Sequence, residues 1–99
     1  MRVAVPVQKQ RFAANFKEFE QVILLDTENH KIQRKRLVRP NIRSCMLPLW
    51  FRQHNVDLLI VGNMNEIAVG LFQKAGIKVV TGAPHLFSEE MIEKYLSDF

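Results

Sequence analysis

The fold can be worked out from one stretch of the chain, Val56-Asp57-Leu58-Leu59-Ile60-Val61-Gly62-Asn63-Met64-Asn65. Its first six residues are apolar except for Asp57. A short apolar run bounded by turn residues is typical of a strand buried on both faces, in a sheet covered by helices. Gly and Asn adopt positive φ readily, so we expect a sharp bend at Gly62-Asn63. The helix that follows would direct its free N–H groups into the crevice at the carboxyl end of the strand, where ligands usually bind.

Three strands are predicted before that stretch, at Arg2–Val7, Gln21–Asp26 and Lys31–Val38. Asn29, which tolerates the left-handed conformation, lies in the turn between the second and third strands. The third strand should return antiparallel to the second. Its many basic residues require at least one face in water, which suits the edge of a sheet.

A helix is predicted from about Cys45 to His54. Pro48 fits its first turn, where a missing N–H loses no partner, and Asn55 is a suitable left-handed stop. A second helix is predicted after the central stretch, because five apolar residues lie at helical spacing. These residues are Ile67, Ala68, Leu71, Phe72 and Ala75. Gly76 should end this helix.

A short strand, Ile77–Thr81, and a last helix complete the chain, with Ser88 as the predicted cap of that helix. Phe87 and Ile92 are spaced as a hydrophobic staple across the cap. The predicted order is strand, strand, strand, helix, strand, helix, strand, helix. A mixed five-stranded sheet with helices on its faces, an α/β fold of the ribonuclease H-like kind, accommodates this order with right-handed crossovers.

Length and composition indicate one ordinary globular domain spanning residues 1–99. The chain is 47% hydrophobic and 24% charged, and no apolar run approaches the roughly 20 residues that cross a bilayer. The apolar part of the N-terminus is too short for a secretory signal. The single cysteine, Cys45, excludes an internal disulfide and suits a reducing compartment, so we expect a cytoplasmic protein.

The net charge of +4 is concentrated in one region. Between Asn29 and Val56 the chain has no acidic residue and seven basic ones: Lys31, Arg34, Lys35, Arg36, Arg39, Arg43 and Arg52. The segment 31–43 could therefore bind an acidic protein or nucleic acid, or it could be a solvated edge strand. It contains no aromatic residues on which bases could stack, which makes nucleic acid the weaker alternative.

Several segments resemble the nitrogenase iron–molybdenum-cofactor biosynthesis family, the NifX-like domains. The likeness covers essentially the whole chain and rests on the segments 1–6, 22–26, 55–62, 73–79 and 81–83. The Ala-Gly-Ile-Lys-Val run beginning at Ala75, followed by a Gly-Ala turn, is its most specific part. The resemblance implies a ribonuclease H-like fold without nuclease activity. It also implies a carrier or chaperone of iron–sulfur or iron–molybdenum cofactor precursors, with cluster donor or acceptor proteins as partners.

The chain departs from the family pattern at three places. Asn15-Phe16-Lys17-Glu18 stands where His-Phe-Gly-Arg is usual, and Gly62-Asn63 where Gly-Gly is common. The glycine-rich segment before the first helix, often with histidine, is here Asn41-Ile42-Arg43-Ser44-Cys45. The resemblance nevertheless implies that Asn15 lines the crevice.

Two residues are candidate metal ligands. Cys45 lies at the predicted start of a helix, which favours thiolate, the natural iron–sulfur ligand. His85 follows the last strand and could reach the same crevice, and imidazole binds iron and zinc. The alternatives are packing for the thiol and a solvated loop for the imidazole. His54, on an apolar helix face, and His30, in a turn, are the weaker histidines.

The crevice could also bind an anion through Gly62, Asn63 and Asn65, which would offer backbone and amide donors. The alternative for these residues is turn formation and helix capping. For catalysis the sequence is poor, because a ribonuclease H site needs several carboxylates around two metal ions and the first strand has none. We therefore expect a non-enzymatic protein. It carries a cofactor precursor, or it has lost the cluster and binds an acidic partner through residues 31–43.

Overall fold

A computed structural model describes residues 1–8, 11–12, 19–82 and 89–97 of the chain. It contains six strands, three α-helices and a short 3-10 helix in these residues. The strands are β1 (Arg2–Gln8), β2 (Arg11–Phe12), β3 (Gln21–Glu28), β4 (Lys31–Val38), β5 (Leu58–Ile60) and β6 (Lys78–Val80). The helices are the 3-10 helix Ser44–Met46, α1 (Leu47–Gln53), α2 (Glu66–Lys74) and α3 (Glu89–Ser97).

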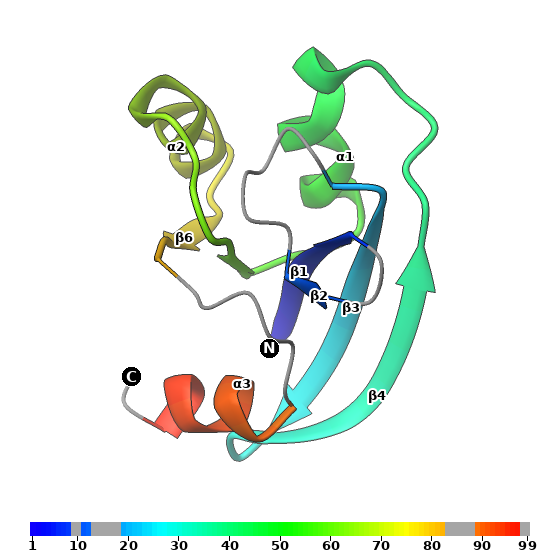
Figure 1. Cartoon of the computed structure of the whole chain (residues 1–99), viewed down its shortest axis with the longest axis vertical. Coiled ribbons are helices and arrows are strands. Elements are labelled where there is room, and N and C mark those ends of the chain that lie inside the picture. The colour runs from blue at the N-terminus through cyan, green and yellow to red at the C-terminus, as the bar shows by residue number, and fades with distance from the viewer. Residues whose placement is uncertain (9–10, 13–18, 83–88, 98–99) are drawn as a thin grey trace.

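Five strands form the mixed sheet that the sequence predicts, in the order β4-β3-β1-β5-β6 (Figure 1). The pairs β4–β3 and β3–β1 are antiparallel, whereas β1–β5 and β5–β6 are parallel. The two-residue β2 was not predicted. It pairs with the end of β1, with Phe12 opposite Val7, and two residues are too few to give a periodicity that a sequence pattern could reveal.

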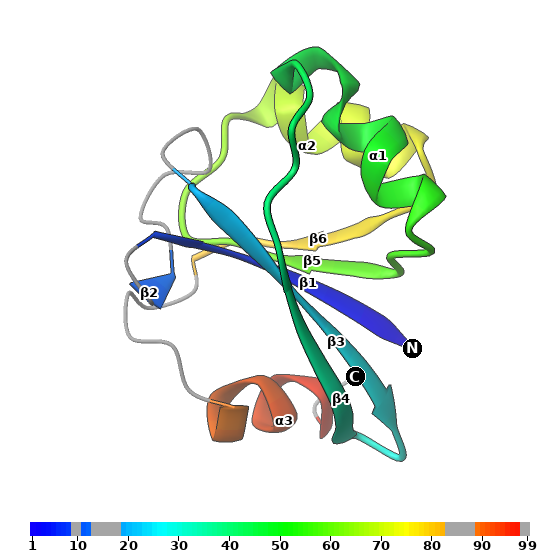
Figure 2. The same ribbon diagram turned by 90° about the vertical axis from the view of Figure 1, so that its right-hand side faces the viewer.

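Helices cover both faces of the sheet: α1 and α2 lie on one face and α3 on the other (Figure 2). The buried side chains accordingly form two clusters. The α3 cluster consists of Val3, Val5, Val7, Ile23, Leu25, Leu58, Ile60, Ile92 and Leu96. The α1–α2 cluster consists of Ala4, Val22, Leu24, Leu47, Phe51, Val56, Leu59, Val61, Phe72 and Ile77.

β5 is buried on both faces, as its continuous apolar sequence predicts. Leu58, Leu59 and Ile60 are all 0% exposed. Leu58 and Ile60 belong to the α3 cluster and Leu59 to the α1–α2 cluster. Successive side chains of a strand point to opposite faces of the sheet. Because both faces are covered by helices here, every residue of β5 is apolar.

Three of the predicted chain reversals are confirmed by the backbone. Asn29 and Asn55 have φ of 53° and 58°, and Gly76, with φ of 85°, follows the end of α2. The chain also bends at Gly62, as predicted. Gly62 and Asn63 are not among the described residues with positive φ, so this bend is made without the left-handed conformation.

The helices differ from the predictions at their ends and surfaces. α1 begins at Leu47, so Cys45 lies in the preceding 3-10 helix and not in the first turn of an α-helix. The predicted apolar face of α2 is only partly buried: Phe72 is 2% exposed, but Leu71 is 52% and Ile67 79% exposed. A nine-residue helix meets the sheet along a narrow strip, and Ile67 and Leu71 lie outside that strip.

Some predictions fall outside the described residues. These include the site candidates Asn15 and His85, the cap Ser88 and the staple residue Phe87. No described helix is both long and apolar enough to span a membrane.

Candidate functional site

The candidate site is the edge of the sheet at which the parallel strands end. β1, β5 and β6 run in the same direction, so their carboxyl ends meet at one edge. Two hydrogen bonds continue the pairing beyond β5 and β6: Val61 N–H donates to the Val80 carbonyl at 2.8 Å, and Gly82 N–H donates to the Gly62 carbonyl at 2.6 Å. After these bonds the chain turns away from Gly62 toward α2, as predicted for a crevice between strand ends.

The segment between β5 and α2 has one packed and several exposed residues. Met64 packs against the α1–α2 cluster, Gly62 is half-buried, and Asn63 and Asn65 are exposed. The Asn65 side chain caps α2, because its Oδ1 accepts the Ala68 N–H at 2.8 Å. The Asn65 side chain therefore makes the helix-capping bond that was the alternative to anion binding.

Cys45 approaches the same edge from a different element. Val38 at the end of β4 pairs with Val22 near the beginning of β3, so β4 ends at the edge where β1 and β5 end. The chain then leads through residues 39–43 to the 3-10 helix that contains Cys45. Its thiol is exposed. Cys45 thus lies one connection beyond the end of β4, and the Gly62–Asn65 segment follows the end of β5.

The described residues do not form a metal centre. They contain no group of three or more His, Cys, Asp or Glu side chains arranged to hold a metal ion. Cys45 is the single thiol of the chain, and His85 and Asn15 fall in the undescribed segments. Any cluster at this edge would therefore have at most one thiolate ligand from the chain.

The two other histidines, His54 and His30, lie in a helix contact and in a turn. His54 stacks on Trp50 with ring centroids 4.0 Å apart, and its Nδ1 lies 2.8 Å from the Trp50 carbonyl oxygen. It is the satisfied, half-buried histidine that the sequence indicates. His30 is exposed in the β3–β4 turn with φ of 66°, which fits its prediction as a turn residue.

The predicted basic segment 31–43 is divided between the two faces of β4. Lys35 lies opposite Leu25 on the α3 face, and Arg36 lies opposite Leu24 on the α1 face. Lys35 Nζ is 3.2 Å from a carboxylate oxygen of Glu89, and Lys31 Nζ is 3.9 Å from one of Glu93. The lysines are therefore partly neutralised by α3, while the arginines are on the other face or beyond the end of the strand.

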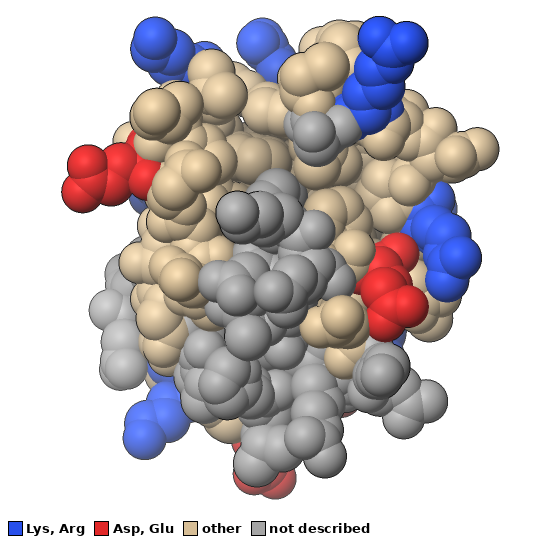
Figure 3. All heavy atoms as spheres, turned by 45° about the horizontal axis from the view of Figure 1, so that its top comes forward, with Lys and Arg blue, Asp and Glu red and all other residues tan. Residues whose placement is uncertain are grey.

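Lys and Arg side chains are also dispersed when the molecule is viewed from above. Figure 3 shows them at separate positions around the rim of that face. On this face the positive charge therefore forms several separate groups.

A second polar group, at the opposite edge of the sheet, was not predicted. Arg2 Nε donates to Asp26 Oδ1 at 2.7 Å, Arg2 Nη1 donates to the His54 carbonyl at 2.7 Å, and the Arg2 backbone N–H donates to Asp57 Oδ2 at 2.8 Å. The hydrogen bond from Arg2 holds the pKa of Asp26 below its usual value, and the same bond raises the pKa of Arg2. The sequence did contain a signal for this group, because charged residues stand at the ends of otherwise apolar strands.

A surface hollow of about 480 Å³ lies along β6. It is lined by Gln73, Gly76, Ile77 and the three residues of β6. Lys78 is its one charged lining residue, and the hollow offers no pair of groups for acid–base or metal chemistry.

Comparison with known proteins agrees with this arrangement. The family model described as dinitrogenase iron–molybdenum cofactor matches residues 1–98. The uncharacterized protein MJ0580 of Methanocaldococcus jannaschii is 24% identical over 108 residues, covering 96% of this chain and 92% of that protein.

Two solved structures share the fold. The crystal structure of PH0822 has a TM-score of 0.85 at 21% identity, covering 99% of this chain and 90% of that one. The apo form of the orange protein from Desulfovibrio gigas has a TM-score of 0.78 at 16% identity, covering 98% and 88%. At these identities the two structures support the architecture alone.

Proposed function

The chain belongs to the dinitrogenase iron–molybdenum cofactor family, and on that premise we propose that it carries an iron–sulfur or iron–molybdenum precursor cluster as cargo. The cargo would bind where β1, β5 and β6 end. The observation that carries the proposal is the match of the family over residues 1–98. It is supported by the exposed thiol of Cys45 and by the parallel strand ends that Val61 and Gly62 continue.

A carrier role suits the small number of ligands at this edge. A resident iron–sulfur cluster is usually held by four cysteine thiolates, and this chain has one cysteine. A preassembled cluster brings its own sulfide ligands, so it can be held by one thiolate and by hydrogen bonds. Weak attachment also favours release, which a carrier requires. Cys45 is the proposed thiolate, and His85 the proposed second ligand.

Absence of catalysis is part of the proposal. The strand carboxylates that could serve a hydrolytic site, Asp26 and Asp57, both bind Arg2. They lie at the opposite edge of the sheet from Cys45 and Gly62. Paired carboxylates at the wrong edge cannot converge on metal ions with the candidate site residues.

The proposed partners follow from the carrier role. A carrier receives its cargo from one protein and delivers it to another, so we expect contacts with cluster donor and acceptor proteins. We expect these exchanges in the cytoplasm, because thiolate ligands are maintained in a reducing compartment.

Anaerobic reconstitution with iron and sulfide tests the proposal. After desalting, the protein should keep a visible absorption band and bound iron. Cys45→Ala and His85→Ala together should remove most of both. His30→Ala is the matched control, since it removes an exposed imidazole far from Cys45 in the β3–β4 turn, and it should change neither.

Two results would oppose the carrier role: a colourless, iron-free product, or a spectrum unchanged in the double variant. Circular dichroism of each variant shows whether the fold is preserved.

A further inference from the structure

We propose that the outer surface around the start of α1 docks an acidic segment of a partner protein that inserts apolar side chains. The surface, called here the α1 surface, consists of Arg39, Ile42, Arg43, Met46, Leu49 and Arg52. It differs from the basic segment 31–43, since it lacks the lysines of β4 and includes apolar residues of α1. The proposal goes beyond cargo binding and does not depend on it.

The apolar part of the α1 surface faces solvent. Ile42, Met46 and Leu49 are 42%, 45% and 46% exposed. The inner side of α1 is already used, because Leu47 and Phe51 are buried in the α1–α2 cluster. Met46 and Leu49 are three residues apart, so they lie together on the outer side. Three partly exposed side chains make a shallow apolar contact area.

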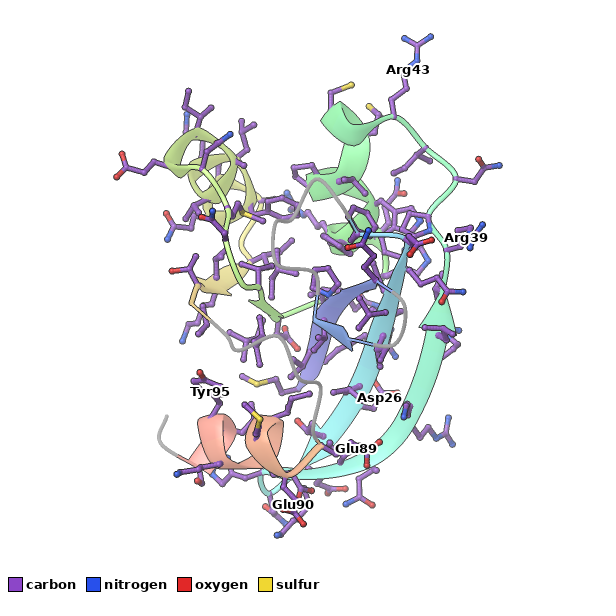
Figure 4. All side chains as sticks on the ribbon, in the orientation of Figure 1. Asp26, Arg39, Arg43, Glu89, Glu90 and Tyr95 are labelled. Atoms are coloured by element: carbon purple, nitrogen blue, oxygen red, sulfur yellow. The ribbon has the colours of Figure 1, made fainter. Side chains whose placement is uncertain are left out.

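The charge of the α1 surface is uncompensated. Arg39, Arg43 and Arg52 are exposed, and none has an ion pair with another described residue. No acidic residue occurs between Asn29 and Val56. Figure 4 shows Arg39 and Arg43 directed away from the body of the molecule, far from Glu89 and Glu90 of α3.

The lysines of β4 provide the contrast. Lys31 and Lys35 are bound by Glu93 and Glu89, so a negative partner would have to displace those carboxylates. At the α1 surface no carboxylate of the described residues would have to be displaced. Complementary charge at such a rim accelerates association and orients the partner.

A protein segment fits this composition better than nucleic acid or a membrane. Phosphates need only the arginines, and single-stranded bases need exposed aromatic rings, whereas this surface offers Ile, Met and Leu. A membrane-binding helix buries its whole apolar face in lipid, but the apolar side of α1 is in the protein core. A segment with carboxylates and an apolar side chain matches both parts of the surface.

Docking there would place the partner beside Cys45, the residue before Met46. A donor or acceptor protein on the α1 surface would therefore reach the thiol that the carrier proposal uses. This is the position a partner needs in order to exchange cargo.

The test uses fluorescence anisotropy with a labelled peptide of glutamate and leucine in helical pattern as the probe. It should bind saturably to the intact protein, and more weakly as salt increases. Replacing Arg39, Arg43 and Arg52 by Glu should lower the affinity at least about tenfold. Met46→Ser with Leu49→Ser should lower it about tenfold through lost apolar contact, without changing the affinity for a matched peptide with serine in place of leucine.

A charge-matched control separates the surface from overall charge. Replacing Lys74, Lys78 and Lys94 by Glu changes the net charge by the same amount, from +4 to −2, and should leave most of the affinity. The proposal is overturned if this control loses as much affinity as the arginine variant, or if no saturable binding occurs. Tighter binding to single-stranded DNA or anionic phosphatidylserine vesicles that is indifferent to the Met46 and Leu49 substitutions would also overturn it.

Discussion

Arg2 and Cys45 illustrate how differently polar residues are placed at the two edges of the sheet. Arg2 binds Asp26, Asp57 and the carbonyl of His54, so it ties the first strand to β3 and to the connection before β5. The Cys45 thiol is exposed at the other edge. At the first edge the polar side chains are hydrogen-bonded to one another and to the backbone. At the second edge the thiol faces solvent, where a ligand could reach it.

The ion pair of Arg2 with Asp26 predicts a pH-dependent stability. The hydrogen bond from Arg2 lowers the pKa of Asp26, so the pair stabilises the fold above about pH 4 and loses this effect as the pH falls through the lowered pKa. Since the side chains are 30% and 39% exposed, Asp26→Asn should lower the free energy of unfolding at pH 7 by only about 0.5–1 kcal/mol.

Urea unfolding of the wild type and Asp26→Asn at several pH values checks this. The difference between the two proteins should shrink as the pH falls through the lowered pKa of Asp26. A difference that does not change with pH would mean that the ion pair is not its cause.

Asn65 gives a second prediction about a single residue. Its Oδ1 accepts the Ala68 N–H, so Asn65→Ala should lower the free energy of unfolding by about 1 kcal/mol, whereas Asn65→Asp should preserve the cap. Chemical denaturation measures both variants. Equal stability of Asn65→Ala and wild type would contradict the capping role.

Residue types predicted the backbone well at some turns and poorly at another. The chain reverses direction next to a helix or strand at Asn29, Asn55 and Gly76. At these positions the residue type predicts positive φ, and the backbone has it. At Gly62-Asn63 the composition equally suggests positive φ, but the structure has none. The Gly62 carbonyl accepts a hydrogen bond from Gly82 N–H, and a tertiary bond of this kind is not visible in local sequence.

The strands were predicted more closely than the helices. A continuous apolar run such as that of β5 has one explanation, because each face of the strand contacts a separate cluster. Helical spacing in α2 gave the correct element but too wide a buried face, since Phe72 is buried while Ile67 and Leu71 are exposed. Periodicity shows which side chains share a side of a helix, but not how wide the contact with the sheet is.

Paired substitutions in α2 test this difference. Phe72 is 2% exposed, and Phe72→Ala should lower the free energy of unfolding by about 3–5 kcal/mol through lost burial and a cavity. Ile67 is 79% exposed, and Ile67→Ser should change it by less than about 0.5 kcal/mol. Thermal and urea unfolding give both values. A large loss of unfolding free energy for Ile67→Ser would contradict the exposed position of that side chain.

The candidate site could be predicted only as a location. The mixed sheet and the crossover between parallel strands follow from the element sequence, whereas the structure supplies the strand order and so the edge at which β1, β5 and β6 end. The ligands Cys45 and His85 stay predictions, because the segments that contain His85 and Asn15 fall outside the described residues. The pairing of the β4 lysines with α3 likewise depends on long-range packing.

The central claim of the proposed function is that the cluster binds at the carboxyl ends of the parallel strands, near Cys45, Gly62 and Gly82, and not at the end of the sheet that bears Arg2. Amide spectra of ¹⁵N-labelled protein, recorded before and after anaerobic reconstitution with iron and sulfide, test this directly. Paramagnetic broadening should be confined to Cys45, Gly62, Gly82 and their neighbours. Broadening centred on Asp26 and Asp57 would contradict the account.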